Sequence, residues 1–134
     1  MTGKGSLNHN SRKFHAKNTD PNRTHWNVEY CNEDIKDVYH ELFDDALKRY
    51  NDKQTRKDRK IDDYYEKIRS GKQEKLFHEV IIQIGDKDNM GSETMEGQLA
   101  AKILDEYMKG FQERNPTLRV FAAHLHLDEA TPHL

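Results

Sequence analysis

The feature that most constrains the fold is an unbroken helical period between residues 35 and 50. Apolar residues recur there at steps of three and four, which places them all on one face of an α-helix. Asn32 is a suitable N-cap, and Lys48 and Arg49 close the segment as the helix dipole favours. This pattern predicts a long amphipathic helix with an apolar face made of Ile35, Val38, Tyr39, Leu42, Phe43, Ala46, Leu47 and Tyr50.

Other periodic segments complete an alternation of strands and helices. Period-two or continuous apolar runs predict strands over residues 26–30, 76–84 and 118–127, the second of them buried. Helical periods predict a short helix over residues 61–70 and a long one over residues 92–114. The order β-α-α-β-α-β indicates an α+β fold in which helices cover one face of a sheet. The last helix is predicted to face inward with Met95, Leu99, Ile103, Leu104, Tyr107, Met108 and Phe111.

Composition favours one folded domain with solvated arms. The chain has 134 residues, of which 34% are apolar and 34% are charged. Residues 1–8 are rich in Gly, Lys, Ser and Asn and predict a flexible arm. No apolar run approaches the length of about 18 residues that a membrane helix needs, so we expect no membrane segment. The single cysteine, Cys31, fits a reducing compartment, and the sequence therefore predicts a cytoplasmic protein.

Two basic segments of the sequence alternate with two acidic ones. The net charge of the chain is −2, whereas residues 1–25 and 53–75 each carry +4 and residues 26–52 and 76–134 each carry −5. Such segments can follow a phosphate backbone, or they can be ordinary solvated faces. Charge alone leaves both interpretations open.

The end of the sequence concentrates side chains that bind metal ions. Residues 124–134 hold three histidines and two acids, Asp128 and Glu129. Imidazole and carboxylate groups are preferred ligands of Zn, Mn, Fe and Mg. On a strand, His124 and His126 would share one face about 6–7 Å apart, either as two ligands or as one ligand and its supporting partner. The proline that follows turns His133 back, so we predict a metal site rather than isolated surface histidines.

A second group of residues near the N-terminus suits the handling of a phosphate. His9 lies between Asn8 and Asn10, with Arg12 and Lys13 close behind. Asparagine can orient an imidazole, and arginine can hold a phosphate through two parallel hydrogen bonds. A neutral imidazole beside a clamped phosphodiester can act as a base or as a nucleophile. The alternative is a polar arm that merely contains histidines.

Residues 23–26 combine cations with an aromatic ring, a combination that stacks the bases of single-stranded nucleic acids. This makes Arg23, His25 and Trp26 candidate contacts, although a Trp26 half buried in the core is the ordinary alternative. Tyr30 lies at a strand end and is the one tyrosine that we would test as a nucleophile. The other five tyrosines fall on apolar helix faces, where core packing explains them.

At this point two separated motifs resemble those of the Mob/Pre plasmid mobilisation relaxases, which nick one DNA strand at a transfer origin. Residues 126–133 are similar to the family signature HxDExTPH. Residues 8–12 and 20–27 are similar to its opening block, HNxR followed by NPxRxHxN. Because the two motifs occur in the right order and far apart, the resemblance covers nearly the whole of residues 1–134, as a single relaxase domain.

The resemblance implies an antiparallel sheet with helices packed on it and a metal site on its strands. It implies that His126 and His133 bind Mn²⁺ or Mg²⁺, that Glu129 is an acid near the ion, and that His9 is the nucleophile. The implied reaction is a transesterification that leaves a covalent 5′-phosphoryl enzyme and a free 3′-hydroxyl. The implied partner is a single strand or hairpin of transfer-origin DNA, contacted by Asn10, Arg12, Lys13, Arg23, His25 and Trp26.

Two departures from the family pattern predict an incomplete domain. The family has a third metal histidine two residues beyond the position of His133, whereas this sequence ends at Leu134. The family also has a short strand before its opening block, and here few residues precede His9. His124 is then a candidate substitute or supporting group. We expect this chain to nick DNA poorly or not at all, while its longer parent does so and can form a homo-oligomer through a C-terminal region outside this sequence.

Two other functions are left open by the sequence. The chain could be a non-catalytic remnant that binds single-stranded DNA, which requires only salt-sensitive affinity without a covalent adduct. It could also be an unrelated metal-dependent hydrolase, which predicts no preference for DNA. The relaxase interpretation alone demands that His9 and His126 come within the span of one phosphate.

Overall fold

The structure, a computed structural model, describes residues 6–134. These fall into two units, one formed by residues up to Asn32 together with Glu79–Leu134, and the other by Glu33–His78. Residues 1–5, part of the arm predicted for residues 1–8, lie outside the described residues. The rest of that segment is not an irregular arm, because Ser6 caps helix α1 (Leu7–Asn10) by accepting a hydrogen bond from the His9 amide.

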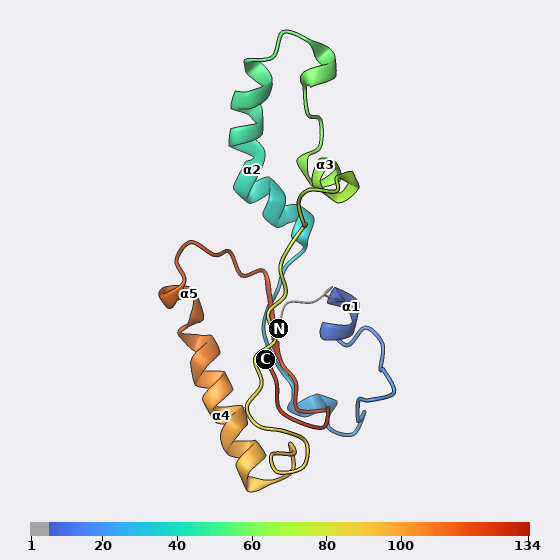
Figure 1. Cartoon of the computed structure of the whole chain (residues 1–134), viewed down its shortest axis with the longest axis vertical. Helices are drawn as coiled ribbons and strands as arrows, with labels where there is room; N and C mark the ends of the chain where they lie inside the picture. The colour runs from blue at the N-terminus through green and yellow to red at the C-terminus, as the bar shows by residue number, and fades with distance from the viewer. Residues whose placement is uncertain (1–5) are drawn as a thin grey trace. The chain divides into compact units, whose positions relative to one another are not determined.

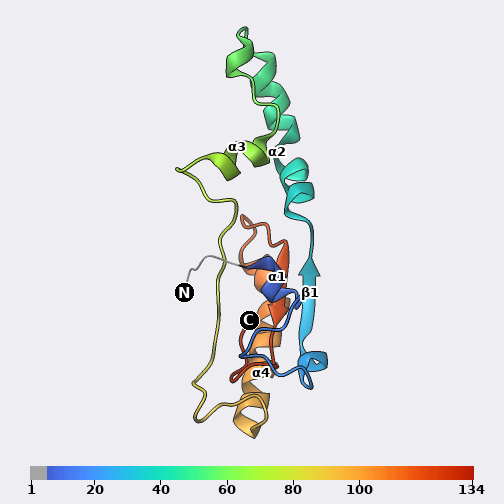
Figure 2. The ribbon, with the colours of Figure 1, turned by 90° about the vertical axis from the view of Figure 1, so that its right-hand side faces the viewer.

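The first unit is built on an antiparallel pair of strands (Figure 2). Strand β1 (Val28–Asn32) pairs with β2 (Ala122–Leu125), and the pairing is irregular between Glu29 and Cys31. The chain enters β1 through a single 3₁₀ turn, η1 (Thr24–Trp26), so Trp26 precedes the strand instead of belonging to it. The predicted α+β class, with helices and an antiparallel sheet, is confirmed.

The strand predicted for residues 76–84 is wrong as a buried strand. Only its end is paired: Ile82 and Leu134 exchange two backbone hydrogen bonds of 2.9 and 2.8 Å, and Gln83 forms an isolated bridge with His133. Val80 and Ile81 stay 57% and 41% exposed. The apolar run indicated burial, but its pairing is confined to Ile82 and Gln83, so its first residues gain no ladder.

Helix α4 (Met95–Lys109) turns mainly small residues inward; of the large residues predicted to face the core Leu104 does so, whereas the prediction is wrong for Met95, Leu99, Ile103 and Tyr107. Gly97, Ala100, Ala101 and Leu104 are buried. Small side chains allow a close approach, since a Cβ on Gly97 would overlap the carbonyl oxygen of Gly91. Figure 1 shows α4, continued by α5 (Phe111–Arg114), on one side of the strands and α1 on the other. The side chains left exposed on α4 are Met95, Leu99, Ile103 and Tyr107.

The core of the first unit is small and lies beside the end of β2. Ala101 and Leu104 of α4 pack there against Leu125 and Leu127. Further apolar residues pack on this cluster from β1, from residues 82–84 and from the chain end. The last residue of β2 is thereby fixed against the helix, and this positions the residues that follow it.

The second unit is a helical hairpin. The N-cap of helix α2 (Ile35–Asp52) is Asp34, and not Asn32 as the sequence predicted. The side chain of Asp34 accepts a hydrogen bond from the amide of Lys36 in the first turn. Helix α3 (Tyr64–Ser70) is capped by Asp63 and ends at Gly71, as predicted. No helix in the described residues is long and apolar enough to span a membrane. Aromatic rings join the two helices, with contacts among Tyr39, Phe43, Tyr64 and Tyr65.

Candidate active site

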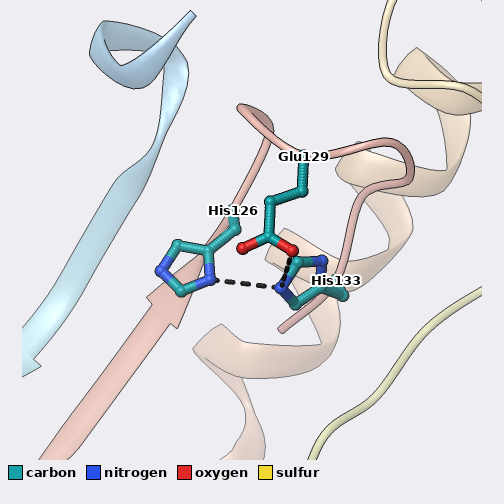
Figure 3. A group of neighbouring side chains, drawn as sticks. All are labelled: His126, Glu129 and His133. Atoms are coloured by element: carbon teal, nitrogen blue, oxygen red, sulfur yellow. Dashed lines mark hydrogen bonds and ion pairs between the residues drawn. The ribbon is translucent and has the colours of Figure 1, made fainter. Parts of the chain in front are cut away.

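Three side chains that bind metals meet where the chain reverses after β2. The backbones of His126 and His133 exchange hydrogen bonds of 2.9 and 3.3 Å, which close residues 127–132 into a turn. Glu129 lies in this turn, and its carboxylate points toward both rings (Figure 3). One ligand atom from each residue lies within 4.8 Å of the other two. The fold therefore brings together the three residues that the sequence predicted at the metal.

The outer hydrogen bonds of the two imidazoles direct their lone pairs toward each other. Nε2 of His126 lies 2.9 Å from the carbonyl oxygen of Asn10, and Nδ1 of His133 lies 3.0 Å from that of Thr131. A carbonyl oxygen only accepts, so these two nitrogens carry the ring protons. Nδ1 of His126 and Nε2 of His133, 3.2 Å apart, are the nitrogens with lone pairs. Backbone carbonyls orient metal-binding histidines in this way.

Burial keeps the imidazole of His126 neutral. The residue is only 5% exposed, and burial lowers its pKa to about 4. The positive charge of Arg12 and the neighbouring ring of His133 contribute to this lowering of the pKa, while the hydrogen bond to the carbonyl of Asn10 opposes it. At neutral pH the ring thus presents a lone pair without first losing a proton, which is what a metal ligand requires.

The fold carries His9 from the other end of the chain to this cluster. Nε2 of His9 lies 3.4 Å from Oε1 of Glu129 and 3.3 Å from Nη1 of Arg12. The ring remains partly accessible, with 27% of its side chain exposed. Glu129 faces His9 with one oxygen and His133 with the other, at 3.9 Å. His9 from the start of the sequence and Glu129 from its end therefore lie next to each other in the fold.

A buried ion pair between Arg12 and Asp128 fastens the N-terminal segment to the turn. Nε and Nη2 of Arg12 donate to the two carboxylate oxygens of Asp128, at 2.9 and 2.6 Å. Nη2 also donates to Glu129 and Nη1 to the carbonyl of His9, both at 2.9 Å. Thr24 adds a hydrogen bond of 3.1 Å to Asp128. Burial alone would raise the pKa of Asp128, but these hydrogen bonds hold it well below its usual range.

Asp128 is the site residue that sequence reasoning missed. Its side chain is fully buried, with 0% exposed, in a pair with a guanidinium that is 8% exposed. The sequence showed an acid between His126 and Glu129 but gave no sign of its partner, which lies near the other end of the chain. The residue types of Asp128 and Glu129 both suit metal binding, but the carboxylate of Asp128 instead accepts hydrogen bonds from Arg12.

The residues predicted to contact DNA differ in their accessibility. Lys13, His25 and Trp26 are exposed, and the rings of His25 and Trp26 lie edge to face with centroids 5.8 Å apart. The other three make contacts within the chain. Asn10 donates to Glu79 and Arg23 to Asp20. Arg12 binds Asp128 and Glu129, so it could grip a phosphate only by leaving them.

Two further candidates lie beside the cluster. His124 stacks on His126 with ring centroids 5.9 Å apart, and its Nδ1 lies 3.6 Å from Glu29, so it is not among the three converging ligands. Tyr30 donates a hydrogen bond of 2.6 Å to Asp105 of α4. Burial and that carboxylate raise the pKa of Tyr30 far above its usual value, which is the opposite of an activated nucleophile.

Comparison with known proteins gives a match to one family and a similarity to a solved structure. The sequence model of the family described as plasmid recombination enzyme matches residues 4–134. The chain is similar, with 28% identity and a TM-score of 0.51, to a Mn-bound crystal structure of the MobM relaxase domain (MOBV) bound to oriT DNA of plasmid pMV158. The match covers 95% of this chain and 58% of that one, so the chain spans little more than half of its relative. No curated protein matches the chain.

Proposed function

The chain belongs to the plasmid recombination enzyme family, and from that membership we propose that it nicks one strand of plasmid DNA at a transfer origin. The reaction is a site- and strand-specific transesterification in the cytoplasm that initiates conjugative mobilisation or plasmid recombination. The similar relaxase domain bound to oriT DNA supports DNA as the substrate. In this proposal the chain is a DNA-nicking enzyme that depends on a metal ion.

The observation that carries the proposal is the convergence of two imidazole lone pairs and one carboxylate next to His9. His126 and His133, with Glu129 beside them, would hold a divalent ion, Mn²⁺ or Mg²⁺. Such an ion supplies positive charge that polarises a non-bridging phosphate oxygen. The donor set fits because burial keeps the His126 ring neutral and because carbonyl oxygens orient both rings from their far sides.

His9 supplies the nucleophile in this proposal. A nitrogen of its ring attacks the scissile phosphorus, an N–P bond forms, and the bond from phosphorus to the 3′ oxygen breaks. The electron pair of that bond goes to the 3′ oxygen, which takes a proton from solvent and becomes a free 3′-hydroxyl. The imidazole becomes positively charged as it bonds to phosphorus, and the carboxylate of Glu129, 3.4 Å away, stabilises that charge.

Binding of the strand falls to the exposed side chains of the N-terminal segment. Lys13 offers charge to a phosphate, and Trp26 with His25 offers ring faces on which unpaired bases can stack. Asn10, Arg12 and Arg23 support this surface from within, through their contacts with Glu79, Asp128 and Asp20. Arg12 in particular ties the strand-binding segment to the carboxylates of the turn.

The experiment that tests the function is the capture of a covalent adduct. The chain, and an extended version of it with one histidine appended after Leu134, are each incubated with labelled transfer-origin strands and Mn²⁺, and a shifted band is sought on a denaturing gel. We expect the adduct of the extended version to vanish in His9→Ala and to persist in the matched change His15→Ala, an exposed histidine of the same segment. The extended version recreates the family's PHxH pattern. It should bind Mn²⁺ at least about tenfold more tightly and nick faster, because the ion gains a ligand.

The same gel separates the competing functions. Salt-sensitive DNA binding without an adduct, even in the extended protein, would leave only the DNA-binding remnant. Membership of the plasmid recombination enzyme family leaves the unrelated hydrolase without support.

A further inference from the structure

The basic segment at the end of α2 takes no part in the site described above. Residues 48–60, which we call the basic tip, comprise the last turn of α2, the loop after it and the 3₁₀ turn η2 (Lys57–Arg59). They contain seven Lys and Arg against two Asp, a net charge of +5. Residues 33–47 contain one Lys against six acids. The charges of one hairpin are therefore segregated along its length.

Most of this positive charge has no carboxylate beside it. Asp52 binds Lys48 and Asp58 binds Arg56, at 3.2 and 2.6 Å, which uses both acids of the basic tip. Within the part of the chain that the structure describes, the remaining five cations make no ion pair, and all five are exposed. They are Arg49, Lys53, Lys57, Arg59 and Lys60.

The helix dipole explains only part of this pattern. Cations in the last turn of a helix are stabilised by its negative end, which accounts for residues 48–53. Lys57, Arg59 and Lys60 lie beyond that turn, where the dipole no longer acts. Their concentration therefore indicates an external anion.

The basic tip is held in a defined shape at its base. The side-chain amide of Asn51 donates to the carbonyl of Ile61 at 2.7 Å and accepts from the Ile61 amide at 2.9 Å. These two bonds close the loop where Figure 1 shows the chain turning back after α2. The backbone of η2 makes its own 3₁₀ hydrogen bond from Lys60 to Lys57. The cations are thus displayed on an ordered loop.

We propose that the basic tip binds the phosphate backbone of duplex DNA, as a contact separate from the strand-nicking site. This inference rests on the proposed function, which makes DNA the partner. Duplex DNA suits the tip better than a single strand because Tyr50 is its only aromatic residue, and single-strand sites need a series of stacking rings. A membrane surface suits it less, since the tip lacks the apolar face that inserts among lipids.

The test measures how binding to a random-sequence duplex depends on salt. Fluorescence anisotropy between about 50 and 200 mM salt gives the slope of log affinity against log salt. Each phosphate contact adds about 0.9 to the magnitude of that slope on duplex DNA. We therefore expect the triple change Lys57→Ala, Arg59→Ala and Lys60→Ala to reduce it by about 2 to 3. Three exposed lysines outside the tip provide a control with the same loss of charge: Lys72→Ala, Lys87→Ala and Lys102→Ala.

The outcomes separate this contact from the chemistry. A slope that changes equally in both triple variants, or in neither, overturns the proposal, as does a tip variant that loses binding only to anionic lipid vesicles. Adduct formation on a short single strand should be unchanged in the tip variant. If no adduct forms at all but the slope still falls selectively, the proposed function fails and the duplex contact stands.

Discussion

The ion pair of Arg12 with Asp128 connects residues that lie 116 positions apart in the sequence. Because Arg12 also donates to Glu129 and to the carbonyl of His9, one guanidinium sets the positions of both groups. Removing one member of a buried ion pair is costly, because the charge that remains is then buried without water or a counter-charge. Asp128 therefore acts on the site through Arg12, as a positioning residue.

At this scale we predict that Asp128→Asn lowers the free energy of unfolding by about 3–5 kcal/mol, the usual result of breaking a buried pair. The guanidinium of Arg12 would keep its charge and lose the carboxylate that offsets it. Chemical denaturation measures the change. The same substitution at Asp45, an exposed acid of α2, should have little effect. Equal stability of the two variants would show that the ion pair does not hold the N-terminal segment.

Among the elements, α4 shows how size can override hydrophobicity in the choice of a buried face. The helical period marked Met95, Leu99, Ile103 and Tyr107 as inward, yet their neighbours with small side chains face β2. Periodicity detects apolar residues but does not detect how closely two backbones must approach. The backbone at Gly91 lies so close to Gly97 that only small residues of α4 fit on this face. The large apolar residues remain on the outer face.

We therefore predict that Gly97→Ala destabilises the protein by about 1–3 kcal/mol, the usual cost of overpacking. In an isolated helix the same change would stabilise by about 1 kcal/mol, so the sign of the effect reports the close approach. Thermal unfolding provides the measurement. Gly110→Ala is the matched control, because a methyl group there meets only the end of the flexible Arg114 side chain. A stabilising Gly97→Ala would contradict the packing of α4 described above.

For the whole molecule, the division into two units limits which residues a bound ion can stabilise. All three candidate ligands lie in the unit that contains the sheet, and none lies in Glu33–His78. A ligand that binds only the folded state stabilises the part whose folding creates its site. The helical hairpin has its own aromatic contacts and needs no ion for them.

Hydrogen exchange should make this division visible. With Mn²⁺ at a hundredfold excess over its Kd, amides of the sheet unit should gain protection of up to about 2.7 kcal/mol, with the paired amides of His126 and His133 among them. Amides within Glu33–His78 should exchange at unchanged rates. The gain should be absent in His133→Ala. Equal protection across both units would instead mean that they unfold together.

The local features of this protein follow from its amino-acid sequence alone. The helical period predicted α2, Gly71 predicted the end of α3, and residue types predicted the cluster of His126, Glu129 and His133. Such features depend on neighbours within a few residues, so the local order of amino acids is enough to specify them. The motifs at the two ends also indicated the family to which the chain belongs.

Only the tertiary structure decided how distant parts meet. It paired Arg12 with Asp128, placed His9 against Glu129, turned the small face of α4 inward and left residues 80–81 without a ladder. Each of these depends on the separation and orientation of segments far apart in the chain. The periodicity of side chains carries no information about such separations. The partners of Asp128, and the hydrogen bonds that orient the rings of His126 and His133, therefore became visible only in the fold.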